Sequence, residues 1–261
     1  MYTLGIDIGS TTSKAVILKD GSDIIASSVV VATVGTDGVP KAVEGVMEES
    51  GLAIGDMSCT VATGYGRQTY EGADHQVSEL SCHALGVYRI FKDARTIIDI
   101  GGQDAKVLAL NEQGRMINFV MNDKCAAGTG RFLDVMANIL NLKIEQLEIE
   151  AQKSQNPVSI SSTCTVFAES EVISQLAAGA KIPDLVEGIC RSVAARTAAL
   201  AKRVGVREKV CMSGGVARNA AIRRAMSREL GMDIAYDEKA QIMGALGAAI
   251  YGFSKVKQGE N

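Results

Sequence analysis

The chain has 261 residues, 47% of them hydrophobic, which is enough for one large domain or two of ordinary size. Its 27 basic and 30 acidic residues give a net charge of −3, so no broad positive field would attract nucleic acid or an anionic membrane surface. The longest apolar stretch, Gly244 to Phe253, is too short to span a bilayer. The N-terminus also lacks a basic region or long apolar run before Asp7, so we expect a cytoplasmic protein with neither nucleic acid nor a membrane as partner.

The first part of the chain predicts a hairpin followed by a strand, a helix, another strand and another helix. Alternating apolar residues and turn residues indicate strands at 2–9, 14–19 and 24–32, with a turn at Asp20-Gly21. A helix follows over 39–50 and ends at Gly51, residues 61–66 form a strand running into a turn, and a helix covers 78–91. We expect this first lobe, residues 1–92, to end there.

The second part repeats that order and adds a glycine turn. Strands are predicted at 96–100, 105–110 and 116–121, and helices at 131–140, 166–178 and 183–204. A strand at 209–212 then opens on Ser213-Gly-Gly-Val-Ala-Arg-Asn219 at the head of a helix. The tail is a small-residue helix containing Gly244-Ala-Leu-Gly-Ala-Ala249, a spacing that lets a helix pack closely on a neighbour. We expect a second lobe over 93–240 and a C-terminal helix, 241–261, that packs back near the hinge between the lobes.

One stretch of sequence occurs twice, as Leu4-Gly-Ile-Asp-Ile-Gly-Ser-Thr-Thr-Ser-Lys14 and as Thr96-Ile-Ile-Asp-Ile-Gly-Gly-Gln-Asp-Ala-Lys106. In each copy an apolar strand leads through an Asp to a glycine turn, where backbone N–H groups can approach an anion without an intervening side chain. Ordinary hairpins whose Asp and Gly only make the turn are the alternative. Because the two copies match in register, we favour an internal duplication of a phosphate-binding hairpin.

The order of these elements resembles the actin, hexokinase and heat-shock-chaperone superfamily of two-lobed α/β ATPases, with duplicated ribonuclease-H-like lobes. The resemblance implies that the two hairpins hold phosphates and that the later Gly-Gly turn holds adenosine. It implies a first phosphate loop from Asp7 to Thr12 together with Lys14, with Gly9, Ser10, Thr11 and Thr12 in the turn. It implies a second phosphate loop from Asp99 to Asp104, with Gly101, Gly102 and Gln103 in the turn. The implied adenosine loop is at Gly214 and Gly215.

Acidic residues in these loops suit a magnesium-bound phosphate. Asp7, Asp99 and Asp104 could hold Mg²⁺, which prefers carboxylate oxygens, or could orient the attacking water. Lys14 is a candidate phosphate contact, and the alternative is a solvated lysine at a strand edge. Lobes that bind ATP and ADP differently would close and reopen with hydrolysis, because a ligand shifts an equilibrium only by its differential affinity.

The six cysteines fall into two groups. Cys59, Cys82, Cys190 and Cys211 lie within strand or helix patterns, so we expect them to fill the core. Cys125 and Cys164 lie in polar segments, Asn122-Asp-Lys-Cys-Ala-Ala-Gly-Thr-Gly130 and Ser161-Ser-Thr-Cys-Thr-Val166, that run directly into predicted helices, and we expect each of the two cysteines to begin a helix. A helix start favours a thiolate or an anionic cluster, and a symmetric dimer would supply four such thiolates. Spacing leaves four interpretations open: an iron–sulfur cluster, a zinc site, a redox disulfide, or two structural thiols.

The two cysteine motifs, together with Asp99-Ile-Gly-Gly-Gln-Asp104, resemble the activator component of 2-hydroxyacyl-CoA dehydratases and the related ATPase subunits of benzoyl-CoA reductases (the BadF/BadG/BcrA type). The likeness runs from Leu4 to Tyr251. It implies a homodimer with one 4Fe–4S cluster bridging the subunits through Cys125 and Cys164 of each. It further implies that ATP hydrolysis drives transfer of one electron to the dehydratase, and that ferredoxin or flavodoxin reloads the activator.

Two other classes of function compete with this interpretation. A small-molecule kinase of the same superfamily would need an acceptor pocket with a base and would leave the two cysteines dispensable. A nucleotide-dependent regulatory module could use the cysteines to hold zinc. Among the remaining residues, Glu169 and Glu171 could tune a cluster or form a partner surface, but acidic residues in a first turn more often stabilise the helix. His75 and His83 are expected to be ordinary polar residues. Gln103 and Asp104 are the candidate link between hydrolysis and Cys125.

Overall fold

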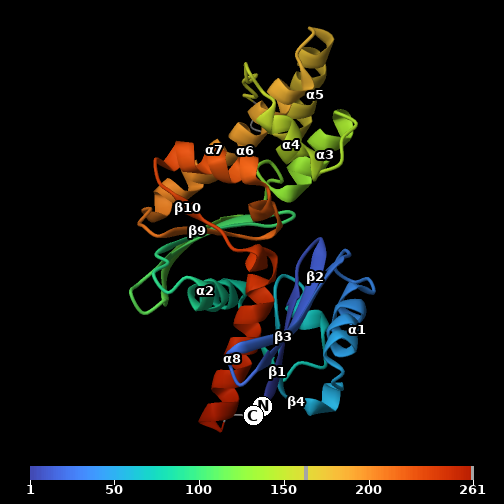
Figure 1. The fold of residues 1–261 in the computed structure, drawn as a ribbon, viewed down its shortest axis with the longest axis vertical. Coiled ribbons are helices and arrows are strands. Elements are labelled where there is room, and N and C mark those ends of the chain that lie inside the picture. Colours follow the sequence, from blue (N-terminus) through green and yellow to red (C-terminus); the bar gives the residue numbers. More distant parts are fainter. Residues whose placement is uncertain (162–163, 260–261) are drawn as a thin grey trace. The chain divides into compact units, whose positions relative to one another are not determined.

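The computed structural model, which describes residues 1–161 and 164–259, divides into two compact units. Unit 1 comprises residues 1–94, 110–117 and 237–261, and unit 2 comprises residues 95–109 and 118–236. Unit 1 therefore contains the first predicted phosphate loop and the C-terminal helix. Unit 2 contains the second phosphate loop, the Gly-Gly turn and both polar cysteine segments (Figure 1).

Unit 1 is built on a five-stranded sheet in the order β3-β2-β1-β4-β5. The first three strands form an antiparallel meander, and β4 and β5 run parallel to β1. The strands are β1 (Tyr2–Ile8), β2 (Thr12–Lys19), β3 (Asp23–Val31), β4 (Met57–Thr63) and β5 (His75–Gln76). The predicted hairpin and third strand are confirmed, whereas β5 has only two residues and no alternation that could be recognised in the sequence.

The alternation along β1 sends its side chains to two differently covered faces. Leu4, Ile6 and Ile8 are fully buried in a core that includes Ala42 and Val46 of helix α1 (Gly38–Ser50). These apolar contacts remove one face of the sheet from water, which is the main stabilising term for such a layer. Helix α1 ends at Gly51 with φ 68°, as predicted.

The opposite face of β1 lies against helix α8 (Met243–Gln258). Thr3 donates its hydroxyl to the carbonyl of Ala249, and a Cβ on Gly5 would collide with the backbone of Ala245. Helix α2 (Glu79–Ile90) packs on α8 just as closely, because a Cβ on Gly247 would collide with the carbonyl of Cys82. Figure 1 shows α8 and α2 beside each other, with α1 across the sheet. The predicted close packing of the small-residue helix is confirmed.

Unit 2 repeats the sheet of unit 1, in the order β10-β9-β6-β7-β8. Strands β6 and β7 are antiparallel, and β9 and β10 run parallel to β6, so β6 takes the place that β1 has in unit 1. The strands are β6 (Thr96–Ile100), β7 (Ala105–Leu110), β8 (Met116–Asn122), β9 (Val210–Ser213) and β10 (Ile234–Ala235). The repeated order agrees with the duplication predicted from the sequence.

The helices of unit 2 include three that were predicted with nearly these bounds. They are α3 (Gly130–Ile139), α5 (Thr165–Ala177) and α6 (Ile182–Val204). Helix α7 (Ala220–Leu230) follows the Gly-Gly turn and packs along α6, whereas α4 (Gln146–Gln152) was not predicted. Within the described ranges, no helix is long and apolar enough to cross a bilayer.

Candidate functional site

The first predicted phosphate loop forms a tight turn around a buried ion pair. Asp7, the penultimate residue of β1, is 4% exposed, and its Oδ2 lies 3.1 Å from Nζ of Lys14, its register partner on β2. The amide of Gly9 donates to the carbonyl of Thr12 at 3.0 Å, which folds Ser10 and Thr11 into the turn. Lys14 is therefore held by Asp7 and is not a solvated strand-edge lysine, the alternative considered from the sequence.

The second loop has the same construction. Asp99, the penultimate residue of β6, pairs in register with Lys106 on β7, with 3.3 Å between Oδ2 and Nζ. The amide of Gly101 donates to the carbonyl of Asp104 at 2.9 Å, as Gly9 does in the first loop. Lys106 is 3% exposed and also lies 2.9 Å from Asp104. Gln103 is exposed at the tip of the turn.

Lys106 and Ser213 belong to this site but were not predicted as site residues. Ser213 ends β9 and donates its hydroxyl to Oδ1 of Asp99 at 2.8 Å, so the two carboxylate oxygens of Asp99 accept from Ser213 and Lys106. Lys106 could have been found, because the duplicated stretch aligns it with Lys14. The Ser213 contact spans 114 positions and depends on the parallel pairing of β6 with β9, so no local pattern indicates it.

A glycine with a left-handed backbone follows the strand beside each loop. Gly214 has φ 84°, and a Cβ there would lie 2.9 Å from Oδ1 of Asp99 and closer still to the carbonyl of Ile100. Gly64 follows β4 with φ 89°, and a Cβ there would lie 2.5 Å from Oδ1 of Asp7. Only glycine fits such a position without strain. In unit 2 the turn that carries Gly214 and Gly215 therefore lies against the phosphate loop, at the carboxyl ends of parallel strands, where ligands of α/β sheets commonly bind.

His83, expected from the sequence to be an ordinary polar residue, lies close to Asp7 of the first phosphate loop. A Cβ added to Gly244 of α8 would lie 2.8 Å from Oδ2 of Asp7 and 3.0 Å from Nε2 of His83. Both side chains are therefore directed at the same point of α8, and both are buried. No local pattern indicates this position, because His83 reaches it only through the packing of α2 on α8.

Four of the cysteines are core residues, as predicted. Cys59, Cys82, Cys190 and Cys211 are at most 1% exposed. Burial raises the pKa of the Cys59 thiol to about 11 and the pKa of the Cys82 and Cys190 thiols to about 12. Such thiols stay protonated and unreactive near neutral pH.

Cys125 and Cys164 are partly exposed thiols in unit 2. Cys164 is the N-cap of α5, as predicted. The prediction that Cys125 begins a helix is wrong, because Gly128 adopts φ 87° and Thr129 becomes the N-cap of α3. Asn122 holds the Cys125 segment instead: its side-chain amide donates to the carbonyl of Cys125 at 2.8 Å, and its Oδ1 accepts from the amide of Cys125.

The start of α3 connects the second phosphate loop to the Cys125 segment. The amide of Gly130 donates to the carbonyl of Gly101 at 2.9 Å, and the amide of Arg131 donates to the carbonyl of Gly102 at 2.7 Å. Thr129, completely buried, donates its hydroxyl back to the carbonyl of Ala126, the residue after Cys125. These hydrogen bonds join the loop to the start of α3 and to the Cys125 segment.

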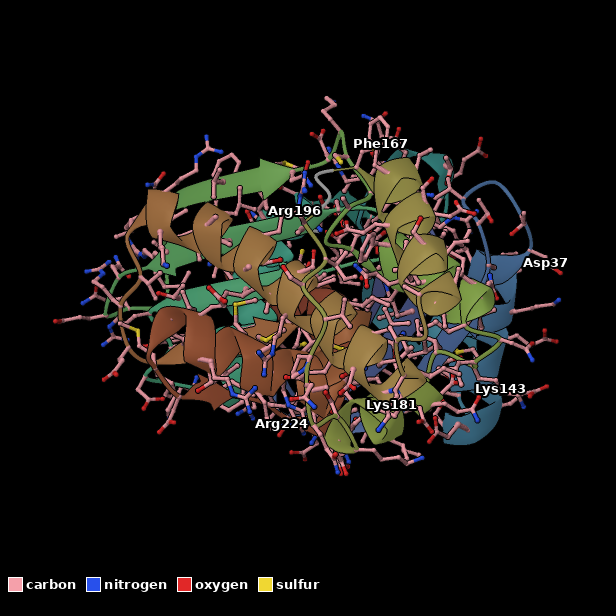
Figure 2. The ribbon with its side chains drawn as sticks, turned by 90° about the horizontal axis from the view of Figure 1, so that it is seen from above. Asp37, Lys143, Phe167, Lys181, Arg196 and Arg224 are labelled. Atoms are coloured by element: carbon pink, nitrogen blue, oxygen red, sulfur yellow. The ribbon has the colours of Figure 1, made fainter. Side chains whose placement is uncertain are left out.

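Ser161, three residues before Cys164, is hydrogen-bonded to an acidic residue of α5. Glu171 accepts from the amide and the hydroxyl of Ser161, each at 3.1 Å, so its role extends beyond the helix stabilisation expected from the sequence. Ser162 and Thr163 of the second cysteine motif lie outside the described residues. In the first turn of α5, Val166 and Phe167 are 66% and 69% exposed. Phe167 is labelled in Figure 2.

Cys125 and Cys164 are the candidate donors for a metal centre. In the described part of the chain, no three Cys, His, Asp or Glu side chains converge on one point. Cys125 and Cys164 are accessible thiols near the starts of α3 and α5, two helices that contact each other. Thiolates are the usual ligands of zinc and of iron–sulfur centres, and these centres need four.

The repeated sheet, with a phosphate-type glycine turn after the first strand of each copy, defines the class of two-lobed actin/hexokinase/heat-shock-chaperone-like ATPases. A glucokinase of the ROK family from Streptomyces griseus shares this fold, with a TM-score of 0.60 at 14% identity over 97% of this chain and all of that one. At that identity the likeness concerns the fold alone.

Within this class, the chain belongs to the BadF/BadG/BcrA/BcrD ATPase family, whose model matches residues 4–252. It is 57% identical to the 2-hydroxyisocaproyl-CoA dehydratase activator of Clostridioides difficile, over 100% of this chain and 98% of that protein. The structure of that activator with bound ADPNP superimposes with a TM-score of 0.97, covering 100% of this chain and 97% of that one. The (R)-2-hydroxyglutaryl-CoA dehydratase activating ATPase of Acidaminococcus fermentans is 55% identical over 98% of each chain. The predicted resemblance is confirmed, and the chain is an ATPase.

Proposed function

We propose that the chain is an ATP-dependent one-electron donor that activates a 2-hydroxyacyl-CoA dehydratase. Its relatives at 57% and 55% identity are named as the activators of two such enzymes, over nearly the whole of each chain. The observation in this structure that carries the proposal is the pair of hydrogen bonds from Gly130 and Arg131 to the phosphate loop, because they connect a nucleotide-binding turn to a thiol segment.

The nucleotide is bound by the duplicated loops and the Gly-Gly turn. In this proposal the backbone N–H groups of Ser10, Thr11 and Gly102 face the phosphates, and Gly214 and Gly215 face the adenosine. Lys14 and Lys106 are held by Asp7 and Asp99 and compensate phosphate charge. Since both oxygens of Asp99 already accept hydrogen bonds within the protein, Asp104, with 24% side-chain exposure, is better placed to hold Mg²⁺ or orient water.

The metal centre is formed by Cys125 and Cys164 from each of two chains in a homodimer. Two accessible thiols per chain make four around a two-fold axis, the number that a 4Fe–4S cluster requires. A bound cluster would supply one-electron chemistry, with ferredoxin or flavodoxin as the source of electrons. The exposed Val166 and Phe167 follow Cys164 in the first turn of α5, so an interface that brings the Cys164 residues together would also cover them.

Coupling between hydrolysis and electron delivery runs from the second phosphate loop to α3. Loss of the γ-phosphate changes what Gln103 and Asp104 contact, and the carbonyls of Gly101 and Gly102 transmit this change to the start of α3. Replacing Gln103 by Ala is expected to leave ATP and the metal centre bound while hydrolysis no longer drives electron delivery. Activation of the dehydratase at the wild-type rate by this variant would count against the route.

The metal assignment is tested by anaerobic purification, followed by the absorption spectrum and by iron and sulfide analysis per dimer. We expect a brown, oxygen-sensitive dimer with about four irons per pair of chains. Cys125→Ser and Cys164→Ser should each abolish the colour, whereas the buried controls Cys59→Ser and Cys190→Ser should retain it. A colourless protein with bound zinc would instead support the regulatory module. Phosphorylation of a small molecule that survives loss of both cysteines would support the kinase.

A further inference from the structure

Arg196 on α6 is in direct contact with one of the two accessible thiols. Its Nη2 donates to Sγ of Cys125, with 3.8 Å between the atoms. Figure 2 shows Arg196 on α6, and the side chain is partly buried. A guanidinium stays protonated across the physiological pH range, so Cys125 has a permanent positive charge beside its sulfur.

The position of Arg196 is fixed from two sides. On α6, the neighbouring Val193, Ala194, Thr197 and Ala198 are all buried, which anchors the helix backbone. On the other side, the Arg196 stem fills the space beside Gly128, where a Cβ would lie 3.0 Å from Cδ and 3.5 Å from Cγ. Gly128 therefore allows the left-handed turn before α3 and also the close approach of Arg196 to the Cys125 segment.

We infer that Arg196 is a positioning residue that sets the reduction potential of the metal centre at Cys125, an inference that rests on the proposed function. One-electron reduction adds a negative charge to a thiolate-bound centre, and a nearby positive charge stabilises the more negative state. Hydrogen bonds to the sulfurs and local charge are known determinants of cluster potentials. Arg196 thus raises the reduction potential of the centre. A higher potential makes it easier for an electron donor to reduce the centre, and the subsequent transfer to the dehydratase then has to be driven by ATP.

The experiment is an anaerobic redox titration of the isolated homodimer, followed by absorbance and electron paramagnetic resonance. Arg196→Gln removes the charge, Arg196→Lys keeps it, and Arg203→Gln is the matched control, an exposed arginine two turns further along α6. For Arg196→Gln we expect the reduction potential to fall by at least about 59 mV. For a one-electron couple, this corresponds to a tenfold change in the ratio of reduced to oxidised centre. Arg196→Lys should remain nearer the wild type, and Arg203→Gln should not differ from it.

The outcomes separate this inference from the proposed function. Suppose that the wild-type dimer contains iron. If the potential is then unchanged in Arg196→Gln, or shifts equally in the Gln and Lys variants, the role of the charge is overturned but the metal centre is not. A wild-type dimer without iron would overturn both. If Arg196→Gln loses its iron, retention in Arg196→Lys supports the charge, and loss in both variants assigns Arg196 a packing role instead.

Discussion

The same buried Asp–Lys ion pair lies beside each of the two predicted phosphate loops. Asp7–Lys14 and Asp99–Lys106 occupy equivalent register positions in the two units, and all four side chains are at most 12% exposed. Burying ion pairs costs desolvation free energy that their mutual attraction only partly offsets, so such pairs are weak stabilisers in themselves. Their repetition beside glycine turns follows from the duplicated stretch of sequence, in which Asp7 matches Asp99 and Lys14 matches Lys106.

Removing one member of the more buried pair should destabilise the protein strongly. In Lys106→Met, Asp99 and Asp104 lose their cation, and an uncompensated buried carboxylate costs about 3–5 kcal/mol. We expect the free energy of unfolding, measured by denaturant titration, to fall by roughly that amount. In the control Lys153→Met, the ion pair lost is with Glu150 and the lysine is 56% exposed, so the change should stay below about 1 kcal/mol. Equal effects of the two variants would contradict the buried role of Lys106.

The carboxylate of Asp184, away from the two phosphate loops, should make the free energy of unfolding depend on pH. The Ser154 hydroxyl and the amides of Asn156 and Gln155 donate to Asp184 and hold its pKa below the usual value. A lowered pKa in the folded state contributes stability above the unfolded pKa of about 3.9, and this stability is lost as pH falls through the folded pKa.

The variant Asp184→Asn should therefore be less stable than the wild type at pH 7, and the difference should shrink as the pH falls below about 4. Thermal unfolding of both proteins between pH 3 and pH 7 measures this. A difference that stays constant across the series would show that hydrogen bonding alone, without ionisation, accounts for the role of Asp184.

At the scale of elements, close packing depends on glycines at helix crossings. Gly5, Gly86 and Gly247 each face backbone atoms of the neighbouring element, so α8 lies directly on β1 and α2. Asp7 is the next residue on the same face of β1 as Gly5, and a Cβ on Gly244 would touch its carboxylate. The packing of α8 therefore positions the first phosphate loop.

Gly247→Ala should disturb this arrangement, because the added Cβ meets the carbonyl of Cys82. Overpacking of this kind costs about 1–3 kcal/mol, and more where backbone must move. The control is Gly55→Ala, where a Cβ meets nothing within 4 Å, so the change should stay within about 0.5 kcal/mol. Unfolding of both variants in denaturant gives the comparison. A Gly247→Ala protein as stable as the wild type would show that α8 can shift without cost.

The elements differ in how readily they could be predicted. The β1–β2 and β6–β7 hairpins were predictable because alternation, turn glycines and the duplication all agree. Helix α4 has seven residues, too few to show a full apolar stripe, and β5 and β10 have two each. The start of α8 was placed too early because residues 238–242 form a 3₁₀ turn. Cys125 was misplaced because its distance from α3 depends on the backbone conformation at Gly128.

For the whole molecule, the central claim is that ATP hydrolysis by this chain drives delivery of one electron. The family and the close relatives support the ATPase and the activator role, and the loop-to-α3 hydrogen bonds support the coupling. A ligand shifts a conformational equilibrium only by its differential affinity, so ATP and ADP must differ in how they hold the second phosphate loop.

The most direct test is anaerobic rapid mixing of the reduced wild-type dimer with a 2-hydroxyacyl-CoA dehydratase, in which phosphate release and reduction of the dehydratase are followed together. With ATP, we predict that the dehydratase is reduced at the rate at which phosphate appears. With ADP or without nucleotide, it should stay oxidised. Reduction that proceeds equally without ATP, or phosphate release with no electron reaching the dehydratase, would contradict the account.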